Sequence, residues 1–342
     1  MIKCQKQNIG LLLVAMALPA LAAPAAAWAT DRKPAVCEDH TPHKIRMVKV
    51  APGVELEVLD WGGKGKPMVL LTGAGDNAHV YDEFAFQFTD YFHVYGITRR
   101  GFLPSSQPRN GYDVPTRAAD DIAVLDALGI DKAVLVGHSL ANSELSELGL
   151  RHRARVDKLV YLDATDLSGS SKLHPPPSAS PLFTDADFQS LWTYQAATAR
   201  YFALREPDQS VCLNLKFDAN GAITGSTSQQ FITDALFARA SANPPVNWAA
   251  IKAPRLGIFA TYSLEARQPH YWYLSPADQA KFDEAWRPIV DFRRDVINRF
   301  KAGNSANTFL LPVLRTMSTS TTRRRWSAGC GTFWAYRQEG EQ

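Results

Sequence analysis

Ser139 stands in surroundings that could make its hydroxyl a nucleophile. The apolar segment Ala133–Val136 is typical of a buried strand, small residues follow it, and the amphipathic segment Asn142–Leu150 is typical of a helix. A serine at the tip of a strand-to-helix turn projects its hydroxyl towards a substrate. The backbone N–H of the next residue, Leu140, would then face the oxygen that becomes negative during acyl transfer. We therefore predict Ser139 as a catalytic nucleophile and Leu140 as one oxyanion donor.

Two small residues frame this turn. The usual pattern is G-x-S-x-G, and here Gly137 and Ala141 occupy the outer positions. We expect Gly137 to adopt the unusual backbone of the turn and Ala141 to let the helix pack close to the strand. Because a serine among small residues is often only a turn residue, the prediction rests on the strand before it and the helix after it.

A glycine-rich loop supplies a second candidate donor. Ala74 lies between two glycines directly after the apolar strand Met68–Leu71, and we expect its N–H to complete the oxyanion hole. The same loop also matches the G-x-G-x-x-A dinucleotide fingerprint, and Arg99 with Arg100 could then face the 2′-phosphate of NADP. That fingerprint normally follows the first strand of its domain, whereas two strands precede it here. An NADP-binding oxidoreductase is therefore only a remote alternative, because it leaves Ser139 unexplained.

The acid that would orient a catalytic histidine has two candidates. Asp163 ends the apolar segment Lys158–Leu162, and Glu265 follows the apolar segment Arg255–Tyr262. An aspartate at the end of a strand is frequently a cap or loop residue. We favour Asp163 and keep Glu265 as the alternative acid.

The general base is missing from its expected place. In serine hydrolases with the chain order Ser, acid, His, the histidine comes last. The family resemblance given below implies a place after the last strand, here Thr308–Leu311, yet no histidine follows His270. Residues 313–342 are rich in Ser and Thr, then carry three arginines, and show no helical periodicity. We interpret this tail as translated out of frame, because synonymous codons read in a shifted frame can spell GAPHYVYLDNEAEVVSGMRDFLGL, with its histidine across Arg315 and Thr316. We expect an impaired hydrolase, with a non-catalytic binding protein as the alternative.

The elements that position these residues alternate between strand and helix. Two segments, Lys44–Val50 and Val54–Trp61, predict an antiparallel hairpin. Further expected elements are the strand His93–Thr98 and the helices Thr116–Leu128 and Pro276–Lys301. Residues 38–165 and 249–312 would form the core. The looser stretch 166–248, with helix-like pieces at Phe188–Leu204 and Gln229–Ala240, would form a lid.

In order and spacing, residues 44–312 resemble the α/β-hydrolase family, in its serine esterase, haloperoxidase-like and proline-iminopeptidase-like branch. The resemblance is carried by Leu70–Gly75, by the loop Gly96–Ser106 and by Gly137–Ala141. It departs at Thr72, where the family usually has His, and at Leu103, which replaces a Gly. The resemblance implies an α/β fold with a mostly parallel eight-stranded sheet, an N-terminal antiparallel hairpin, helices on both faces and a helical lid after strand 6. It also implies a small-molecule substrate and no cofactor.

Aromatic residues are frequent in the expected lid and after the strand Arg255–Tyr262. They are Phe183, Phe188, Trp192, Tyr194, Tyr201, Phe202, Tyr271, Trp272 and Tyr273. At helical spacing such residues mostly form the core of the lid. If some face the pocket, they favour a small, apolar ester or amide substrate.

Composition narrows the functional classes. The chain has 342 residues, 46% of them hydrophobic, which is enough for one large α/β domain or two ordinary ones. A net charge of +3 gives no indication of nucleic-acid binding.

The first residues are typical of a signal peptide. Residues 1–29 combine Lys3 and Lys6, an apolar stretch that is short for a membrane span, and the cleavage pattern Ala-Trp-Ala at 27–29. We expect export to a periplasm or the medium and no stable membrane association after cleavage. An uncleaved anchor is the alternative.

Cys37 and Cys212 would remain in the mature chain. In an oxidising compartment they could pair, or they could stay as free thiols. No metal-binding spacing such as C-x-x-C is present, and we expect no metal site.

Overall fold

The computed structural model describes residues 37–163, 166–170, 173, 183–202, 205–262, 271, 274–303 and 306–313. The predicted signal peptide, the alternative acid Glu265, His270 and most of the unusual tail therefore lie outside the described residues.

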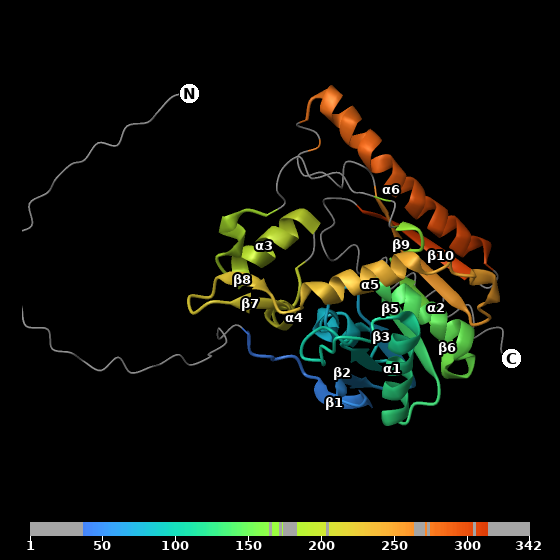
Figure 1. The fold of residues 1–342 in the computed structure, drawn as a ribbon. Coiled ribbons are helices and arrows are strands. Elements are labelled where there is room, and N and C mark those ends of the chain that lie inside the picture. The colour runs from blue at the N-terminus through green and yellow to red at the C-terminus, as the bar shows by residue number, and fades with distance from the viewer. Residues whose placement is uncertain are drawn as a thin grey trace, which may run out of the picture. The chain divides into compact units, whose positions relative to one another are not determined.

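Eight strands form one sheet in the order β1-β2-β4-β3-β5-β6-β9-β10 (Figure 1). The hairpin β1–β2 is antiparallel, β2 pairs antiparallel with β4, and the remaining neighbours are parallel. This confirms the expected α/β fold and its N-terminal hairpin. The strands are β1 (Lys44–Ala51), β2 (Val54–Gly63), β3 (Lys66–Leu71), β4 (Phe92–Ile97), β5 (Ala133–His138), β6 (Val156–Leu162), β9 (Arg255–Tyr262) and β10 (Ala306–Val313).

Both faces of the sheet are covered by apolar side chains. Alternate residues of each central strand point to opposite sides, so each face has its own apolar cluster. Val69 and Leu71 of β3 belong to one apolar cluster, whereas Met68 and Leu70 belong to the other. Three α-helices contribute side chains to the first cluster, and two short 3₁₀ helices contribute side chains to the second. These elements are α1 (Val114–Ala127), α2 (Asn142–Arg151), α6 (Pro276–Ala302), η2 (Ala78–Tyr81) and η3 (Ala85–Gln87).

The helix starts follow their capping signals. Asp113 accepts a hydrogen bond from Thr116 N at 3.0 Å before α1, and Ser275 accepts one from Asp278 N at 3.2 Å before α6. Pro276 occupies the first turn of α6, where its missing N–H costs nothing. Within the part of the chain that the structure describes, no helix has the length and apolar character needed to cross a bilayer.

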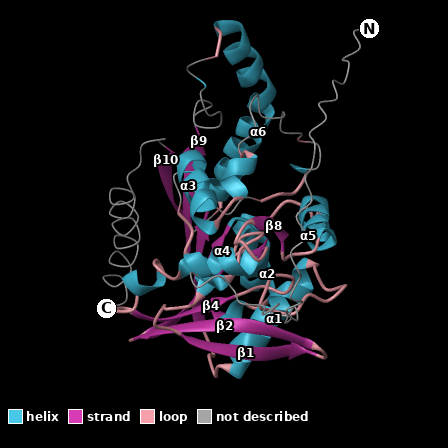
Figure 2. Ribbon diagram, turned by 90° about the vertical axis from the view of Figure 1, so that its left-hand side faces the viewer, coloured by secondary structure: helices cyan, strands magenta, loops and turns pink. Residues whose placement is uncertain are grey.

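The chain between β6 and β9 carries the expected insertion, but it is not wholly helical. Figures 1 and 2 show its helices together with a short hairpin. The hairpin forms because Asp218 Oδ1 accepts the N–H groups of Asn220 and Ala222 at 2.8 and 2.9 Å, and Gly221 has φ 84°. Its elements are α3 (Leu191–Phe202), α4 (Asp208–Asn214), β7 (Leu215–Phe217), β8 (Ile223–Ser226) and α5 (Gln230–Ala242).

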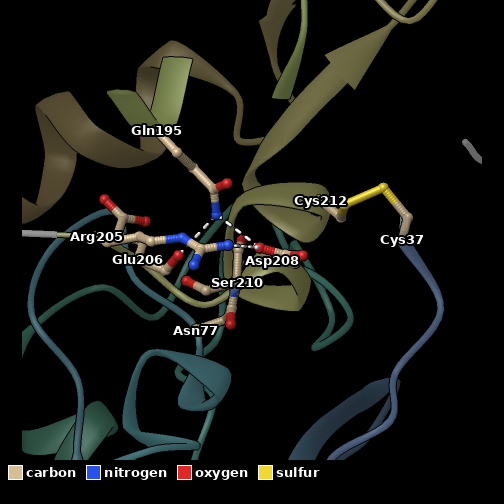
Figure 3. The surroundings of a disulfide bond; sticks show 8 residues. All are labelled: Cys37, Asn77, Gln195, Arg205, Glu206, Asp208, Ser210 and Cys212. Carbon is tan, nitrogen blue, oxygen red and sulfur yellow. Dashed lines mark hydrogen bonds and ion pairs between the residues drawn. A yellow bond between two sulfur atoms is a disulfide. The ribbon is translucent and has the colours of Figure 1, made fainter. Parts of the chain in front are cut away.

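A disulfide joins Cys37 to Cys212, so the two cysteines pair (Figure 3). It attaches the segment before β1 to α4. On the other side of α4, Asn77 Nδ2 donates to Ser210 O and to Asn214 Oδ1, both at 3.0 Å. The insertion is thus fastened to the loop after β3, where the oxyanion donor Ala74 is expected.

Candidate active site

Ser139 sits at the junction of β5 and α2 with a left-handed backbone, φ 50°. A non-glycine residue with positive φ is strained, and such strain is concentrated at functional sites. The side chain is partly exposed, and Leu140 beside it is buried. This is the strand, sharp turn and helix that the sequence predicts around a nucleophile.

Gly137 has a different role from the one expected. Positive φ falls on Ser139 and not on Gly137, so the glycine is not needed for an unusual backbone. A Cβ at position 137 would lie 2.8 Å from Ala141 Cβ and 2.8 Å from Leu145 Cδ1. Gly137 therefore permits the close approach of α2 to β5, together with the fully buried Ala141.

The loop after β3 lies beside this turn. Leu71 pairs in register with Gly137, so residues 72–75 and the Ser139 turn leave neighbouring parallel strands at the same edge. Ala74 packs on the same apolar cluster as Leu140. A Cβ at position 73 would lie 2.6 Å from Asp76 Oδ2 and 2.8 Å from His138 Nδ1, so this loop closely approaches the residue before Ser139. The two candidate oxyanion donors thus share one site.

Arg99 holds this loop in place. Its Nη1 and Nη2 donate to the carbonyl oxygens of Gly73 and Thr72, both at 2.9 Å, and its Nε donates to Glu144 Oε1 of α2 at 2.7 Å. Arg99 is 7% exposed and Glu144 is 2% exposed. Burial opposes ionisation of Glu144, but Arg117 and Arg99 lower its pKa below the ordinary value. A buried ion pair therefore links the oxyanion loop to the helix that follows Ser139.

Asp163 follows β6 at the level of Ser139 and also has positive φ, 43°. Its Oδ1 accepts hydrogen bonds from Arg293 Nη2 of α6 at 2.5 Å and from Ala260 N of β9 at 3.1 Å. The carboxylate is thus held between α6 and β9, and neither contact could be predicted from the sequence. Asp163 lies across neighbouring strands from Ser139, and Arg293 is a partner that the sequence did not predict.

His138 is the imidazole nearest in sequence to Ser139. Its side chain is 44% exposed, and its Nδ1 lies 3.6 Å from Asp76 Oδ2. His93 instead pairs with Asp60 at 2.7 Å and stacks on Tyr95 in β4. His79 is fully buried in η2.

Three of the aromatic residues named above contact one another, whereas the side chains of Tyr201, Phe202, Trp272 and Tyr273 lie outside the described part of the chain. Phe183 stacks on Tyr194 at 5.7 Å between ring centroids, and Phe188 lies 5.7 Å from Phe183. Trp192 is 70% exposed. Tyr271 is buried and donates to Asp283 of α6 at 3.0 Å. The contacts agree with the lid-core interpretation for Phe183, Phe188 and Tyr194.

The two arginines of the NADP alternative are engaged elsewhere. Arg100, 4% exposed, forms an ion pair with Asp120 at 2.5 Å, and Arg99 is committed to Glu144 and the loop carbonyls. Neither guanidinium is presented to a phosphate, which counts against a dinucleotide site.

Sequence reasoning missed two groups of buried polar residues. One is the ion pair of Arg99 with Glu144, which joins residues distant in sequence. The other contains Asp39, His43, His79 and Asp82. The available signal was the spacing of two pairs, Asp39 with His43 four residues apart and His79 with Asp82 three apart.

Comparisons with known proteins agree with the fold. Residues 66–213 match the family model described as alpha/beta hydrolase fold. The structure resembles that of an E-2-(acetamidomethylene)succinate hydrolase with a TM-score of 0.56 and 19% identity, over 84% of this chain and 99% of that one. A bromoperoxidase from Bacillus anthracis gives a TM-score of 0.54 at 17% identity, over 85% and 100% of the two chains.

Sequence relatives cover a smaller part of the chain. It is 28% identical to the N-formylmaleamate deformylase of Pseudomonas putida over 168 residues, 49% of this chain and 62% of the relative. It is 33% identical to the non-heme chloroperoxidase of Streptomyces lividans over 120 residues, 34% of this chain and 44% of the relative. Each match spans less than two-thirds of the relative's own length.

Proposed function

Because the chain belongs to the α/β-hydrolase fold family, we propose that it is a serine hydrolase that cleaves an ester or amide through an acyl-enzyme on Ser139. The observation that carries the proposal is the left-handed backbone of Ser139, φ 50°, between β5 and α2. Hydrolases among its relatives support the general class of reaction.

The reaction assigns one task to each group. Ser139 Oγ attacks the carbonyl carbon, and its proton passes to a general base. The carbonyl oxygen becomes negative and accepts hydrogen bonds from the N–H groups of Ala74 and Leu140. Collapse of this intermediate expels the alcohol or amine, which takes the proton from the base. Water then releases the acyl group by the same route, while Asp163 orients the base.

The chain as printed lacks the base at its usual position, because no histidine follows His270. We propose that the tail beyond β10 is out of frame and that this chain is an impaired hydrolase. Loss of a triad histidine lowers turnover on the order of 10⁴-fold or more, and the oxyanion hole and substrate binding supply what remains.

The proposed substrate is small and largely apolar. Phe102, Tyr112 and Leu140 form an apolar cluster with Ile232 and Leu236 of α5, and Ala74 packs on it. Such surroundings favour an uncharged acyl group beside the oxyanion donors.

Two proteins test this proposal together. One is the printed chain, and the other carries the shifted-frame sequence in place of residues 313–336. Turnover of p-nitrophenyl esters of short acids should be on the order of 10⁴-fold higher in the second protein and should vanish in its Ser139→Ala variant. Equal turnover by both proteins would contradict the impairment, and full turnover by Ser139→Ala would contradict the nucleophile.

The absence of a histidine after residue 270 also favours a second candidate, a non-catalytic binding protein. It predicts that the protein with the restored tail still fails to react with a fluorophosphonate probe, whereas the hydrolase proposal predicts rapid reaction. Gene sequencing decides the origin of the tail, because only some codons allow the alternative frame.

We also propose that the protein is exported after cleavage near Ala29. The Cys37–Cys212 disulfide supports this, since disulfides persist mainly in oxidising compartments. Edman sequencing of the protein recovered from a periplasmic extract tests it, and a new N-terminus close to residue 30 is the expected result. Recovery of uncleaved protein from the cytoplasm alone would contradict it.

A further inference from the structure

Four side chains of metal-binding type meet where the segment before β1 crosses η2. Asp39 and His43 come from that segment, and His79 and Asp82 come from η2 and its C-terminal end. One ligand atom of each lies within 4.8 Å of those of the other three. The His43 and His79 side chains are each 1% exposed, Asp82 is 4% exposed and Asp39 is 18% exposed. We call these four residues the His43–His79 cluster.

Three of the separations between these atoms are close to those around a small divalent ion, and the wider ones, up to 4.8 Å, would shorten on binding. Asp39 Oδ2 lies 3.1 Å from His43 Nε2 and 3.6 Å from His79 Nδ1, and His79 Nδ1 lies 3.0 Å from Asp82 Oδ2. Ligand atoms about 2.0–2.2 Å from a tetrahedral Zn²⁺ lie about 3.3–3.6 Å from one another. Two imidazoles and two carboxylates are a donor set that zinc accepts, and the two carboxylates balance its charge.

The surroundings of the cluster orient its members as an outer shell would. Glu57 Oε1 of β2 lies 3.2 Å from His79 Nε2, which leaves Nδ1 of that ring facing the cluster. Trp61 Nε1 donates to Asp82 Oδ1 at 3.0 Å. Histidines that bind metal ions almost always donate their other N–H to a carboxylate or carbonyl, and carboxylates that bind them are themselves hydrogen-bonded.

His43 supplies an independent sign that a ligand belongs here. Both ring nitrogens are buried, and neither makes a hydrogen bond of acceptable geometry. The contacts to Asp39 Oδ2 at 3.1 Å and Asp82 Oδ1 at 3.2 Å are close but badly directed. Leaving a buried polar group without a hydrogen bond destabilises the folded state. A cation between these groups would satisfy His43 through one nitrogen.

We propose that Asp39, His43, His79 and Asp82 bind one Zn²⁺ ion in a structural site. The site would fasten the segment that begins at the disulfide to η2. That 3₁₀ helix follows the oxyanion loop, and Tyr81 OH at its end donates to Leu71 O at 2.9 Å. The ion would therefore stabilise the base of the loop that carries Ala74, without touching the reacting atoms.

The competing state holds a proton in place of the ion. Burial lowers the pKa of His79, but hydrogen bonds to Asp82 and Glu57 outweigh it and raise the pKa to about 9. A protonated His79 between carboxylates would be a closed ion network with no affinity for zinc. A measurement of zinc binding therefore distinguishes a cluster that binds zinc from one that holds a proton on His79.

The test uses the full chain, stripped with EDTA, dialysed and titrated with ZnCl₂ by calorimetry. We expect one tightly bound equivalent, retention of one zinc per chain after gel filtration, and a rise of several degrees in Tm. The His43→Ala variant should lose this equivalent, with affinity at least about 100-fold weaker. The matched control is His40→Ala, since His40 lies on the same segment and its side chain is 81% exposed.

A milder variant guards against misfolding. Trp61→Phe removes the donor to Asp82 and keeps the aromatic ring, and it should weaken zinc binding about 10–100-fold. Co²⁺ in place of zinc should give the visible absorption of a tetrahedral site in the parent protein and not in folded His43→Ala. If the stripped parent binds no zinc, or if His43→Ala binds it as well as His40→Ala does, the proposal is wrong.

Discussion

Ser139 and Asp163 leave adjacent parallel strands at the same level, because His138 of β5 pairs in register with Leu162 of β6. Both residues have positive φ, 50° and 43°. Non-glycine residues adopt this conformation rarely, and two of them side by side at the carboxyl edge of a parallel sheet indicate a functional edge. This relationship supports our proposal that Ser139 is the nucleophile and Asp163 the acid.

Asp163→Asn should lower kcat by about 10⁴-fold in the protein with the restored tail, because the amide favours the wrong histidine tautomer. Asp166→Asn is the matched control, since Asp166 also follows β6 and pairs with an arginine of α6, Arg299, at 2.9 Å. It should lower Tm and leave kcat near the parent value. An unchanged kcat in Asp163→Asn would return the role of the acid to Glu265.

Arg99→Met should destabilise the fold by about 3–5 kcal/mol, because it leaves Glu144 buried without its closest cation. Urea unfolding followed by fluorescence measures this change. Arg151→Met removes an ion pair with Glu147 in which the arginine is 73% exposed, and it should cost less than about 1 kcal/mol. Similar losses in the two variants would show that the buried ion pair of Arg99 with Glu144 stabilises the fold no more than an exposed ion pair does.

Glu206 makes stability depend on pH. Burial, with a contribution from Asp76, raises the pKa of Glu206 from its ordinary value of 4.5 to about 7. The stabilising contribution of the protonated form is complete below pH 4.5 and is lost as pH rises through about 7. The free energy of unfolding of Glu206→Gln should therefore rise relative to that of the parent as pH increases from 4.5 to about 7. Above pH 7 the difference should level off at about 3 kcal/mol.

Unfolding curves of Glu206→Gln and the parent at pH 5 and pH 8 measure this difference. Glu284→Gln, on the exposed side of α6, serves as the control and should match the parent at both values. A gain for Glu206→Gln that is the same at both pH values would contradict the assignment.

Removing the disulfide should cost about 2–5 kcal/mol, since it closes a long loop in the unfolded chain. The bridged cysteines are 175 residues apart. The double variant Cys37→Ala/Cys212→Ala should unfold at lower urea than the parent, whereas Cys330→Ala should not. Equal midpoints for the parent and the double variant would show that the bridge does not stabilise the fold.

Much of the fold could be predicted because its signals are local. The apolar run Ala133–Val136 is buried in the sheet, and Ser275 with Pro276 marks the start of α6. Helix α4 and the hairpin β7–β8 were not predicted, because short elements of an insertion depend on contacts such as Asn77 with Ser210. Strands β7 and β8, of three and four residues, are too short to show a period of two in the sequence.

The candidate site was predicted less completely than the fold. Ser139 and Ala74 lie in recognisable local patterns, and pairing of β3 with β5 brings them to one edge. Arg293 could not be assigned to Asp163, because 130 residues separate them. The His43–His79 cluster was missed for the same reason, since its two halves meet only when the chain before β1 crosses η2.

The most direct test of the central claim is the site of covalent labelling by a fluorophosphonate, located by tandem mass spectrometry in the protein with the restored tail. The account predicts an adduct on Ser139, no adduct in Ser139→Ala, and normal labelling in Ser146→Ala, which changes another serine of α2. An adduct on a different residue, or unchanged labelling of Ser139→Ala, would contradict it.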